Sequence, residues 1–438
     1  MFRLSSRRIA AAAAIASCSV LLAACSSGSG SGSADKADTS GTAPTGVTLT
    51  MWHNASDSQA LLDLYKAYEK ASGNTIDLVS LPGDTYPNAV QTKWATGDRP
   101  DILEYMRSPQ DMRQLNMTQN MVDLSSMSFV KAEGSLKDVA GTLNGKTYGA
   151  VLGPVSTFGV YYNKKVLAAA GLKAPTNYSE LASDCSALKS AGKTTVAVGG
   201  GSEFPSMMIP GFTYMGDYNA NDAWGDSIAS GKAKVTDSSD PLLAGLKTLA
   251  SLKSNGCLNK DAATANFQTA EKAVYSGSAA FTVLPSDMIA DFYKLGSSAS
   301  AVDATVGFGP ISAKKGVASY APGSYGTYYV PKTGDSTKQR AAEDFIDWVT
   351  TKGYQTYIND AKLPTTLSTA TTPKLTGMYA SMASMLSAPT SVVAFNNVVP
   401  GFGNFGKICV KVLAGQDTAQ KAASEFQTFI DQARAAQQ

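Results

Sequence analysis

Three residues that could take part in binding stand at the end of the first predicted strand. Residues 47–52 alternate β-branched and apolar side chains, which predicts a strand, and Trp52, His53 and Asn54 lie at its carboxyl end. In an open parallel sheet, ligands collect beyond the carboxyl ends of strands, where loops and helix N-termini meet. An aromatic ring followed by polar groups at this position indicates a ligand site. The alternatives are a core tryptophan, a surface histidine and a turn asparagine.

The composition excludes several other kinds of site. His53 is the only histidine among 438 residues, so the chain has no multi-histidine metal site, and Ser-His-Asp chemistry would need that one residue. The 37 basic residues nearly balance the 35 acidic ones and give a net charge of +2, which supplies no electrostatic footprint for nucleic acid. We therefore expect no metal, no cofactor and no nucleic-acid partner.

The first 24 residues have the pattern of a secretory signal peptide. Arg3, Arg7 and Arg8 precede a largely apolar run over residues 9–24. The run ends in Leu-Ala-Ala-Cys at residues 22–25, which resembles the lipobox of bacterial lipoproteins. This resemblance implies cleavage before Cys25 and attachment of a lipid to its thiol. The alternative is an ordinary signal peptide followed by an unrelated cysteine.

A linker follows the predicted cleavage site. Residues 26–46 are almost entirely Ser, Gly, Ala, Thr and Asp, a composition that cannot bury enough apolar surface to fold. We expect residues 25–46 to be the lipidated cysteine and a flexible tether that holds the domain within about 25 Å of its anchor. The folded part is then expected to begin at residue 47.

Three cysteines remain after Cys25, so they cannot all pair within the chain. Outside the cell one disulfide is chemically allowed. We predict a bond between Cys185 and Cys257, because both adjoin predicted helix ends in the same half of the chain. Cys409 lies in an apolar stretch, and we expect it to be a small buried side chain.

Strand and helix signals alternate along the folded part. A helix with one apolar face is expected to begin after Ser56 or Asp57 and to end at Gly73, with a second strand over residues 75–80. Further strand or helix signals lie at residues 102–105, 160–162, 178–190 and 195–198. The alternation predicts an α/β fold whose sheets are largely parallel, with helices on both faces.

Several short motifs follow one another in a recognisable order. They are Gly97 with Pro100-Asp101 before a strand, Gly-Lys-Thr-Tyr-Gly at 145–149, Tyr-Tyr-Asn-Lys at 161–164, Ala-Gly-Leu at 170–172 with Pro175, residues 178–181, residues 276–281, the helix over 341–349, and Leu363-Pro364. This order resembles the extracellular solute-binding proteins of ABC importers, in the branch that takes sugars and oligosaccharides. The resemblance covers nearly the whole chain after the tether.

The resemblance implies a two-lobed, type II periplasmic-binding-protein-like fold with a hinge and an interlobe ligand cleft. Mapped onto this chain, lobe 1 is expected over residues 47–152 and 312–363. Lobe 2 is expected over residues 153–311 and 364–438. The first crossing is expected at Gly153 and Pro154.

A sugar-binding cleft requires aromatic platforms for the sugar faces and fixed polar groups for the hydroxyls. The aromatic residues expected in loops near the cleft are Trp52, Tyr86, Tyr105, Phe204, Tyr214, Trp224, Tyr325 and Phe395. The expected hydroxyl binders are His53, Asn54, Asp84, Glu104, Asp287, Asn396 and Asn397. Asp84 and Glu104 are the preferred carboxylates because they follow the second and third strands. A turn or cap role is the alternative for each polar residue.

The resemblance further implies a monomeric receptor on the outer face of a bacterial membrane, held by its lipid, that closes on an oligosaccharide and delivers it to an ABC permease. No catalytic residue is expected. One alternative is a secreted glycosidase that uses two carboxylates such as Asp84 and Glu104. Another keeps the fold and binds a different solute, for example a phosphate ester cradled by the glycines at 199–201.

Overall fold

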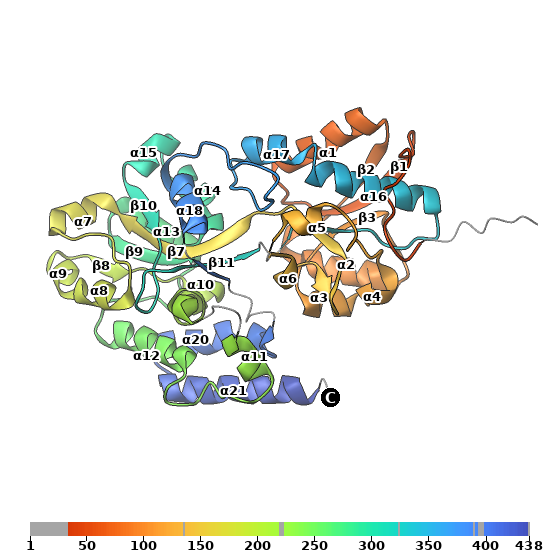
Figure 1. Ribbon diagram of the computed structural model, residues 1–438. Coiled ribbons are helices and arrows are strands. Elements are labelled where there is room, and N and C mark those ends of the chain that lie inside the picture. The colour runs from red at the N-terminus through yellow and green to blue at the C-terminus, as the bar shows by residue number, and fades with distance from the viewer. Residues whose placement is uncertain are drawn as a thin grey trace, which may run out of the picture.

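The computed structural model describes residues 34–134, 136–218, 223–322, 325–388, 390–392 and 398–436. The predicted signal peptide, Cys25 and the first part of the tether lie outside these residues, as do Phe395, Asn396 and Asn397. The described chain forms two lobes side by side, and each lobe has its own sheet and surrounding helices (Figure 1). The expected two-lobed α/β fold is confirmed.

Lobe 1 is built on a five-stranded sheet in the order β2-β1-β3-β12-β6. Its strands are β1 (Thr48–Asn54), β2 (Thr75–Leu81), β3 (Ile102–Tyr105), β6 (Gly149–Val151) and β12 (Thr327–Tyr329). The first three strands are parallel, so Asn54, Leu81 and Tyr105 end at one edge of the sheet. A separate hairpin of β4 (Thr142–Leu143) and β5 (Lys146–Thr147) directly precedes β6 in the sequence.

Helices on both sides cover this sheet (Figure 1). They are α1 (Gln59–Ser72), η1 (Gly83–Thr85), α2 (Tyr86–Ala95), α3 (Pro109–Gln114), α4 (Met117–Asn120), α5 (Phe129–Ala132), α6 (Leu136–Val139), α16 (Ser336–Thr350) and α17 (Tyr354–Ala361). Helix α1 ends at Gly73 as expected, where φ is 73°. Its N-cap is Ser58, whose side chain accepts from the Leu61 N–H, and not Ser56 or Asp57. Those two residues face the cleft described below.

Lobe 2 has a sheet in the order β13-β11-β7-β9-β8, with β10 paired to the other end of β7. These strands are β7 (Val155–Asn163), β8 (Thr194–Val196), β9 (Ala279–Pro285), β10 (Val306–Gly309), β11 (Ala318–Pro322) and β13 (Thr390–Val392). β7 pairs antiparallel with β9, β10 and β11, so the expectation of largely parallel sheets is wrong for this lobe. The reason is that β7 enters from the other lobe and runs against its neighbours.

The helices of lobe 2 surround this sheet on several sides (Figure 1). They are α7 (Lys164–Ala170), α8 (Tyr178–Ser183), α9 (Cys185–Ser190), α10 (Phe204–Met207), α11 (Ala223–Ala229), α12 (Pro241–Ser254), α13 (Phe267–Ser276), α14 (Ile289–Lys294), α15 (Ala299–Asp303), α18 (Gly377–Ser387), α20 (Phe405–Ala414) and α21 (Ala419–Ala435). Short turns of other helix types are η2 (Gly200–Ser202), η3 (Met208–Thr213), η4 (Tyr214–Asp217), η6 (Ser286–Met288) and η7 (Phe402–Asn404).

Two of the expected lobe boundaries are displaced. β11 pairs with β7 in the sheet of lobe 2, so the second crossing lies after Pro322 and not at residue 312. The return crossing also comes later than Leu363-Pro364, because Leu367 is part of the lobe 1 core and the Ser368 N–H donates to Ala132 O (2.8 Å). Every hydrophobic cluster of the described residues lies within a single lobe, which leaves the hinge segments to connect two separate cores.

Two crossing segments touch at a pair of glycines. The N–H groups of Leu152 and Gly153 both donate to Gly326 O (2.9 Å each). A Cβ on Gly153 would lie 2.4 Å from Tyr325 O, and a Cβ on Gly326 would lie 2.5 Å from Gly153 Cα. Gly326 also has a φ of 86°, which side chains disfavour. The predicted crossing at Gly153 therefore depends on a second glycine that brings the two segments into backbone contact.

The later part of the expected tether is docked on lobe 1. Ala37 N–H donates to Asp123 O (3.0 Å), and Asp38 N–H donates to Glu343 Oε2 (3.0 Å) on α16. Further along, Asn74 Nδ2 donates to Pro44 O (3.0 Å). Hydrogen bonds to fixed partners hold a segment whose composition alone predicts no folding. We call residues 34–46 the N-terminal strap.

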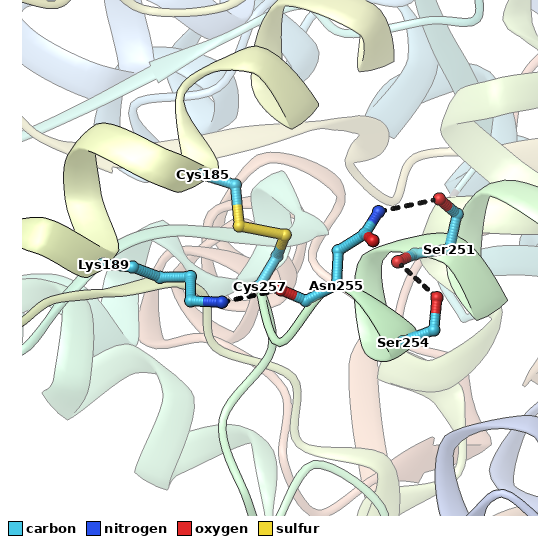
Figure 2. The surroundings of a disulfide bond; sticks show 6 residues. All are labelled: Cys185, Lys189, Ser251, Ser254, Asn255 and Cys257. Carbon is cyan, nitrogen blue, oxygen red and sulfur yellow. Dashed lines mark hydrogen bonds between the residues drawn. A yellow bond between two sulfur atoms is a disulfide. The ribbon is translucent and has the colours of Figure 1, made fainter.

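A disulfide joins the predicted pair of cysteines in lobe 2. Cys185 begins α9 and Cys257 follows α12, with their Cα atoms 5.6 Å apart (Figure 2). Beside the bond, Lys189 Nζ donates to Asn255 O (2.9 Å), so the two helix ends are joined by a second contact. Cys409 is free and fully buried in α20, and burial raises the pKa of its thiol.

The N-terminal strap predicts a stability difference between two truncations. Removal of residues 1–46 eliminates the strap's hydrogen bonds and leaves the carboxylate of Glu343, which is 2% exposed, without the Asp38 donor. We expect the free energy of unfolding in urea to fall by about 1–3 kcal/mol relative to a chain that lacks only residues 1–33. Equal urea midpoints for the two truncations would show that the strap adds no stability.

Candidate ligand-binding cleft

A cleft of about 570 Å³ lies between the lobes. Its lobe 1 wall comes from the end of β1, the start of α1, β3 and α17, and its lobe 2 wall comes from η6, α14 and α18. The crossing segments form its floor. The lining residues include Asn54, Ser56, Asp57, Ser58, Gly83, Glu104, Gly153, Pro154, Ser286, Asp287, Tyr325, Gly326, Tyr357, Tyr379 and Met382.

The carboxyl group of Glu104 connects the lobe 1 wall to the hinge. Its Oε2 accepts the N–H of Asn54 (2.9 Å), and its Oε1 accepts the N–H of Gly326 (3.0 Å). The residue is 1% exposed. Burial, followed by the nearby charge of Asp57, raises the pKa of Glu104 to about 8, and the two backbone donors oppose this increase. Glu104 therefore holds a proton at neutral pH while it fixes two backbone segments.

Asp57 continues this network toward His53. The Asp57 carboxyl contacts Glu104 by a side-chain hydrogen bond. Asp57 Oδ2 also lies 3.0 Å from His53 Nδ1, and His53 Nε2 lies 2.6 Å from Ser80 Oγ. Four side chains from three segments are thus joined, and the network runs from the cleft lining at Glu104 and Asp57 to His53 and Ser80 behind it. His53 is 4% exposed and does not line the cleft, so it supports Asp57 from behind.

Asp287 is the carboxylate of the lobe 2 wall. Both of its oxygens accept from the Ser156 hydroxyl (2.7 Å each), which fixes the side chain against β7. The residue is exposed to the open cleft, yet protein surrounds it on several sides. This surrounding protein raises the pKa of Asp287, whereas the Ser156 hydrogen bond and the charge of Arg107 lower it. Asp287 offers its remaining lone pairs to the space between the lobes.

Three tyrosines supply the aromatic surface of the cleft. Tyr325 belongs to the hinge and meets the Tyr86 ring edge-to-face at 5.8 Å. Tyr357 comes from α17 of lobe 1, and Tyr379 comes from α18 of lobe 2. Tyr379 is held by the ring of Tyr293 at 5.7 Å. Rings therefore face the cleft from the hinge and from both lobes.

The structure brings four of the predicted site residues to the cleft, namely Asn54, Glu104, Asp287 and Tyr325. Asn54 and Glu104 are largely engaged within the protein, because Asn54 Oδ1 accepts the Ser56 N–H (2.8 Å) and Glu104 accepts two backbone donors. Asp84 lies in η1 beside the lining residue Gly83, and its side chain is outside the described residues. Direct ligand contact by these residues remains a prediction.

Three predicted aromatic residues lie in the core of lobe 1 instead. Trp52, Tyr86 and Tyr105 are at most 2% exposed and pack in one cluster. β1 is buried on both faces over its second half, so a residue at its end points into the protein even though the strand reaches the cleft. Trp52 contacts Lys93, whose Nζ lies 4.9 Å from the ring centre.

The predicted aromatic residues of lobe 2 also lie away from the cleft. Phe204 packs 5.5 Å from Phe267, and Tyr214 stacks 5.9 Å from Tyr178. Trp224 donates from Nε1 to Asp240 Oδ2 (2.8 Å). None of the three lines the cleft, because each covers the core beneath its own helix or turn.

Several lining residues were not predicted from the sequence. Asp57 and Ser58 precede α1, and Ser286 follows β9, so strand-end reasoning extended by a few residues would have included them. Tyr357, Tyr379 and Met382 lie on helices α17 and α18, far from the other lining residues in sequence. No sequence signal places these helices on either side of a cleft.

Within the described ranges, no group of three or more His, Cys, Asp or Glu residues could hold a metal ion. None of the helices in the same part of the chain is long and apolar enough to cross a membrane.

The raised pKa of Glu104 predicts a pH effect on stability. Between about pH 4.5 and 8, folded Glu104 keeps a proton that the unfolded chain loses, so the free energy of unfolding falls as pH rises through this window. The largest slope for one proton is about 1.4 kcal/mol per pH unit. We expect Glu104→Gln to lose this slope in urea titrations across the window.

Glu133 provides the matched control, because burial raises its pKa to about 8 as well and it lies outside the cleft lining. Glu133→Gln is expected to remove a similar slope without the hinge contacts of Glu104. A Glu104→Gln profile parallel to that of the unmodified protein would contradict the assignment of a bound proton to Glu104.

Solved structures with the same fold were found at low sequence identity. A chitin oligosaccharide binding protein matches with a TM-score of 0.71 and 22% identity, covering 89% of this chain and 99% of that chain. The protein RafE in complex with raffinose matches with a TM-score of 0.67 and 18% identity, covering 89% and 100%. A binding protein of an ABC transporter from Bifidobacterium animalis subsp. lactis, in complex with mannobiose, matches with a TM-score of 0.65 and 16% identity, covering 89% and 95%.

These likenesses extend over nearly all of each solved chain and show the fold. A comparison with curated proteins found no match. The family described as bacterial extracellular solute-binding protein matches residues 53–356, which is more than half of the chain and includes lining residues from both lobes and from the crossing segments. The chain therefore belongs to the family of bacterial extracellular solute-binding proteins.

Proposed function

We propose that this protein binds a neutral carbohydrate, most simply an oligosaccharide, in the interlobe cleft and releases it unchanged to an ABC importer. The observation that carries the proposal is the lining of the cleft. Tyrosine rings and hydrogen-bonding groups come from both lobes, and no lysine, arginine or histidine is among the described lining residues. Rings suit the C–H faces of a sugar, and carboxyl and hydroxyl groups suit its hydroxyls.

The size of the cleft and the nature of the relatives support this ligand class. A volume of about 570 Å³ falls within the range of about 300–1,000 Å³ that is typical of small-molecule sites. The solved relatives include proteins whose titles name chitin oligosaccharide, raffinose and mannobiose, and one of them serves an ABC transporter. A phosphate ester would instead require cations in the lining.

The chemistry of the acidic residues favours binding over hydrolysis. Glycosidases separate their two carboxyl groups by about 5–5.5 Å or about 6.5–9.5 Å so that the sugar or a water fits between them. Asp57 and Glu104 are joined by a direct hydrogen bond, and Glu104 also holds two backbone N–H groups. This pair leaves no room for a sugar between its members. The alternative pair of Asp84 and Glu104 is disfavoured because both oxygens of Glu104 are engaged by backbone N–H groups. We therefore propose a receptor and not an enzyme.

The proposed setting is the outer face of a bacterial cytoplasmic membrane, with a lipid on Cys25 as the anchor. It rests on the lipobox-like residues 22–25 and on membership of an extracellular family. The proposed receptor acts as a monomer because both walls of the cleft belong to one chain. Its partner would be the permease that recognises the closed form.

A calorimetric screen of the mature protein against neutral oligosaccharides tests this proposal. We expect saturable binding of at least one member of the panel, with the sugar recovered intact. Tyr379→Ala removes a ring of the lobe 2 wall and is expected to weaken that binding by roughly 5- to 30-fold, equivalent to about 1–2 kcal/mol.

Tyr275 offers a control, since it is a half-buried tyrosine of the same lobe that does not line the cleft. Tyr275→Ala is expected to leave sugar affinity within about twofold of the unmodified protein. Equal losses in the two variants, or binding of a phosphate ester but of no neutral sugar, would refute the proposed ligand class.

A further inference from the structure

Arg107 is a buried cation at the boundary between the lobes. It follows β3 by two residues, at the carboxyl edge of the sheet that faces lobe 2. The residue is 7% exposed, and its Nε is buried without a hydrogen bond. In the part of the chain that the structure describes, no ion pair or hydrogen bond reaches the guanidinium group. A buried charge without compensation is costly, so this arrangement calls for a partner in another state of the molecule.

The charge of Arg107 persists under ordinary conditions. Burial lowers the pKa of its guanidinium group to about 10, while the charges of Asp111 and Asp287 raise it. The side chain therefore remains protonated at neutral pH. Because the guanidinium group keeps its charge, the free-energy cost of burying it is not removed by loss of the proton. A hydrogen-bond acceptor is needed to offset that cost.

Two carboxylates act on Arg107, and they lie in different lobes. Asp111 lies in the same lobe and accepts the hydroxyl of Ser108, the N-cap of its own helix α3. Asp287 lies in lobe 2, where both of its oxygens accept from the Ser156 hydroxyl, and of the two carboxylates only Asp287 changes its distance from Arg107 when the lobes move. The attraction between Arg107 and Asp287 therefore acts from one lobe to the other. No ion pair forms between them in this structure, so a further approach is possible.

We propose that Arg107 donates hydrogen bonds to the Asp287 carboxylate when the lobes close, and so fixes that carboxylate against the ligand. Arg107 is then a positioning residue, because Asp287 lines the cleft whereas Arg107 does not. A guanidinium group can hold a carboxylate through two parallel hydrogen bonds, which suits this task. The inference rests on the proposed function to the extent that closure accompanies ligand binding.

A double-mutant cycle with calorimetry tests the pairing. Arg107→Met and Asp287→Asn are each expected to weaken oligosaccharide binding by about tenfold or more, and the double variant is expected to be little weaker than Asp287→Asn alone. Arg107→Lys keeps the charge and is expected to recover part of the affinity. Arg113→Met, which removes an exposed arginine from α3, serves as the control and is expected to bind normally.

Thermal unfolding without ligand separates this role from a structural one. Because no hydrogen bond reaches the buried Nε of Arg107 in this structure, Arg107→Met is expected to leave the unliganded Tm unchanged or to raise it. A lowered Tm with normal affinity would overturn the proposal. The proposal would also be overturned if the losses of binding free energy in the two single variants simply add in the double variant. Either result would assign Arg107 to local structure or to direct ligand contact.

A distance measurement in the absence of sugar distinguishes failure of this inference from failure of the proposed ligand class. Fluorescent labels at Lys66→Cys in lobe 1 and Lys272→Cys in lobe 2 report lobe closure. Even if no sugar binds, we expect Arg107→Met and Asp287→Asn to reduce the fraction of closed molecules equally, with no further reduction in the double variant. Identical closure in all of these proteins would overturn the pairing.

Discussion

The contacts of one buried carboxyl group underlie the arrangement of the cleft. Glu104 accepts the N–H of Asn54 at the end of β1 and the N–H of Gly326 in the second crossing segment. Without it, two backbone donors in the cleft wall would lack this acceptor, and the crossing segment would not be fixed to the lobe 1 sheet. The close approach of Gly326 to Gly153 then transmits this position to the first crossing. The crossing segments are thus fixed to lobe 1. Lobe 2 is attached where these segments continue into it.

The separate cores explain why such a hinge can work. Each hydrophobic cluster of the described residues belongs to one lobe, so relative movement of the lobes breaks no core packing. The cleft walls are likewise divided, with Asp57 and Tyr357 on one side and Asp287 and Tyr379 on the other. A ligand that contacts both walls gains more contacts in the closed form than in the open form. This difference in contacts is what couples binding to closure.

Sequence patterns predicted the parts of this structure that depend on local chemistry. The end of α1 follows from Gly73, the bounds of β3 follow from its short apolar run, and Asn54, Glu104 and Tyr325 reach the cleft because they lie at strand ends or crossings. Tertiary contacts decided the remainder. Trp52 is in the core because β1 is buried on both faces near its end, and alternation alone does not show which face meets the cleft. Tyr357 and Tyr379 reach the cleft through helix packing across long sequence separations, and the N-terminal strap is ordered by partners on lobe 1.

The most direct test of a receptor that grips its ligand between two lobes is small-angle X-ray scattering of the mature protein with an oligosaccharide that it binds. The account predicts a smaller radius of gyration in the presence of the sugar, full recovery of the unmodified sugar, and return to the larger radius after dialysis. A radius that does not change at saturation, or conversion of the sugar into products, would contradict it.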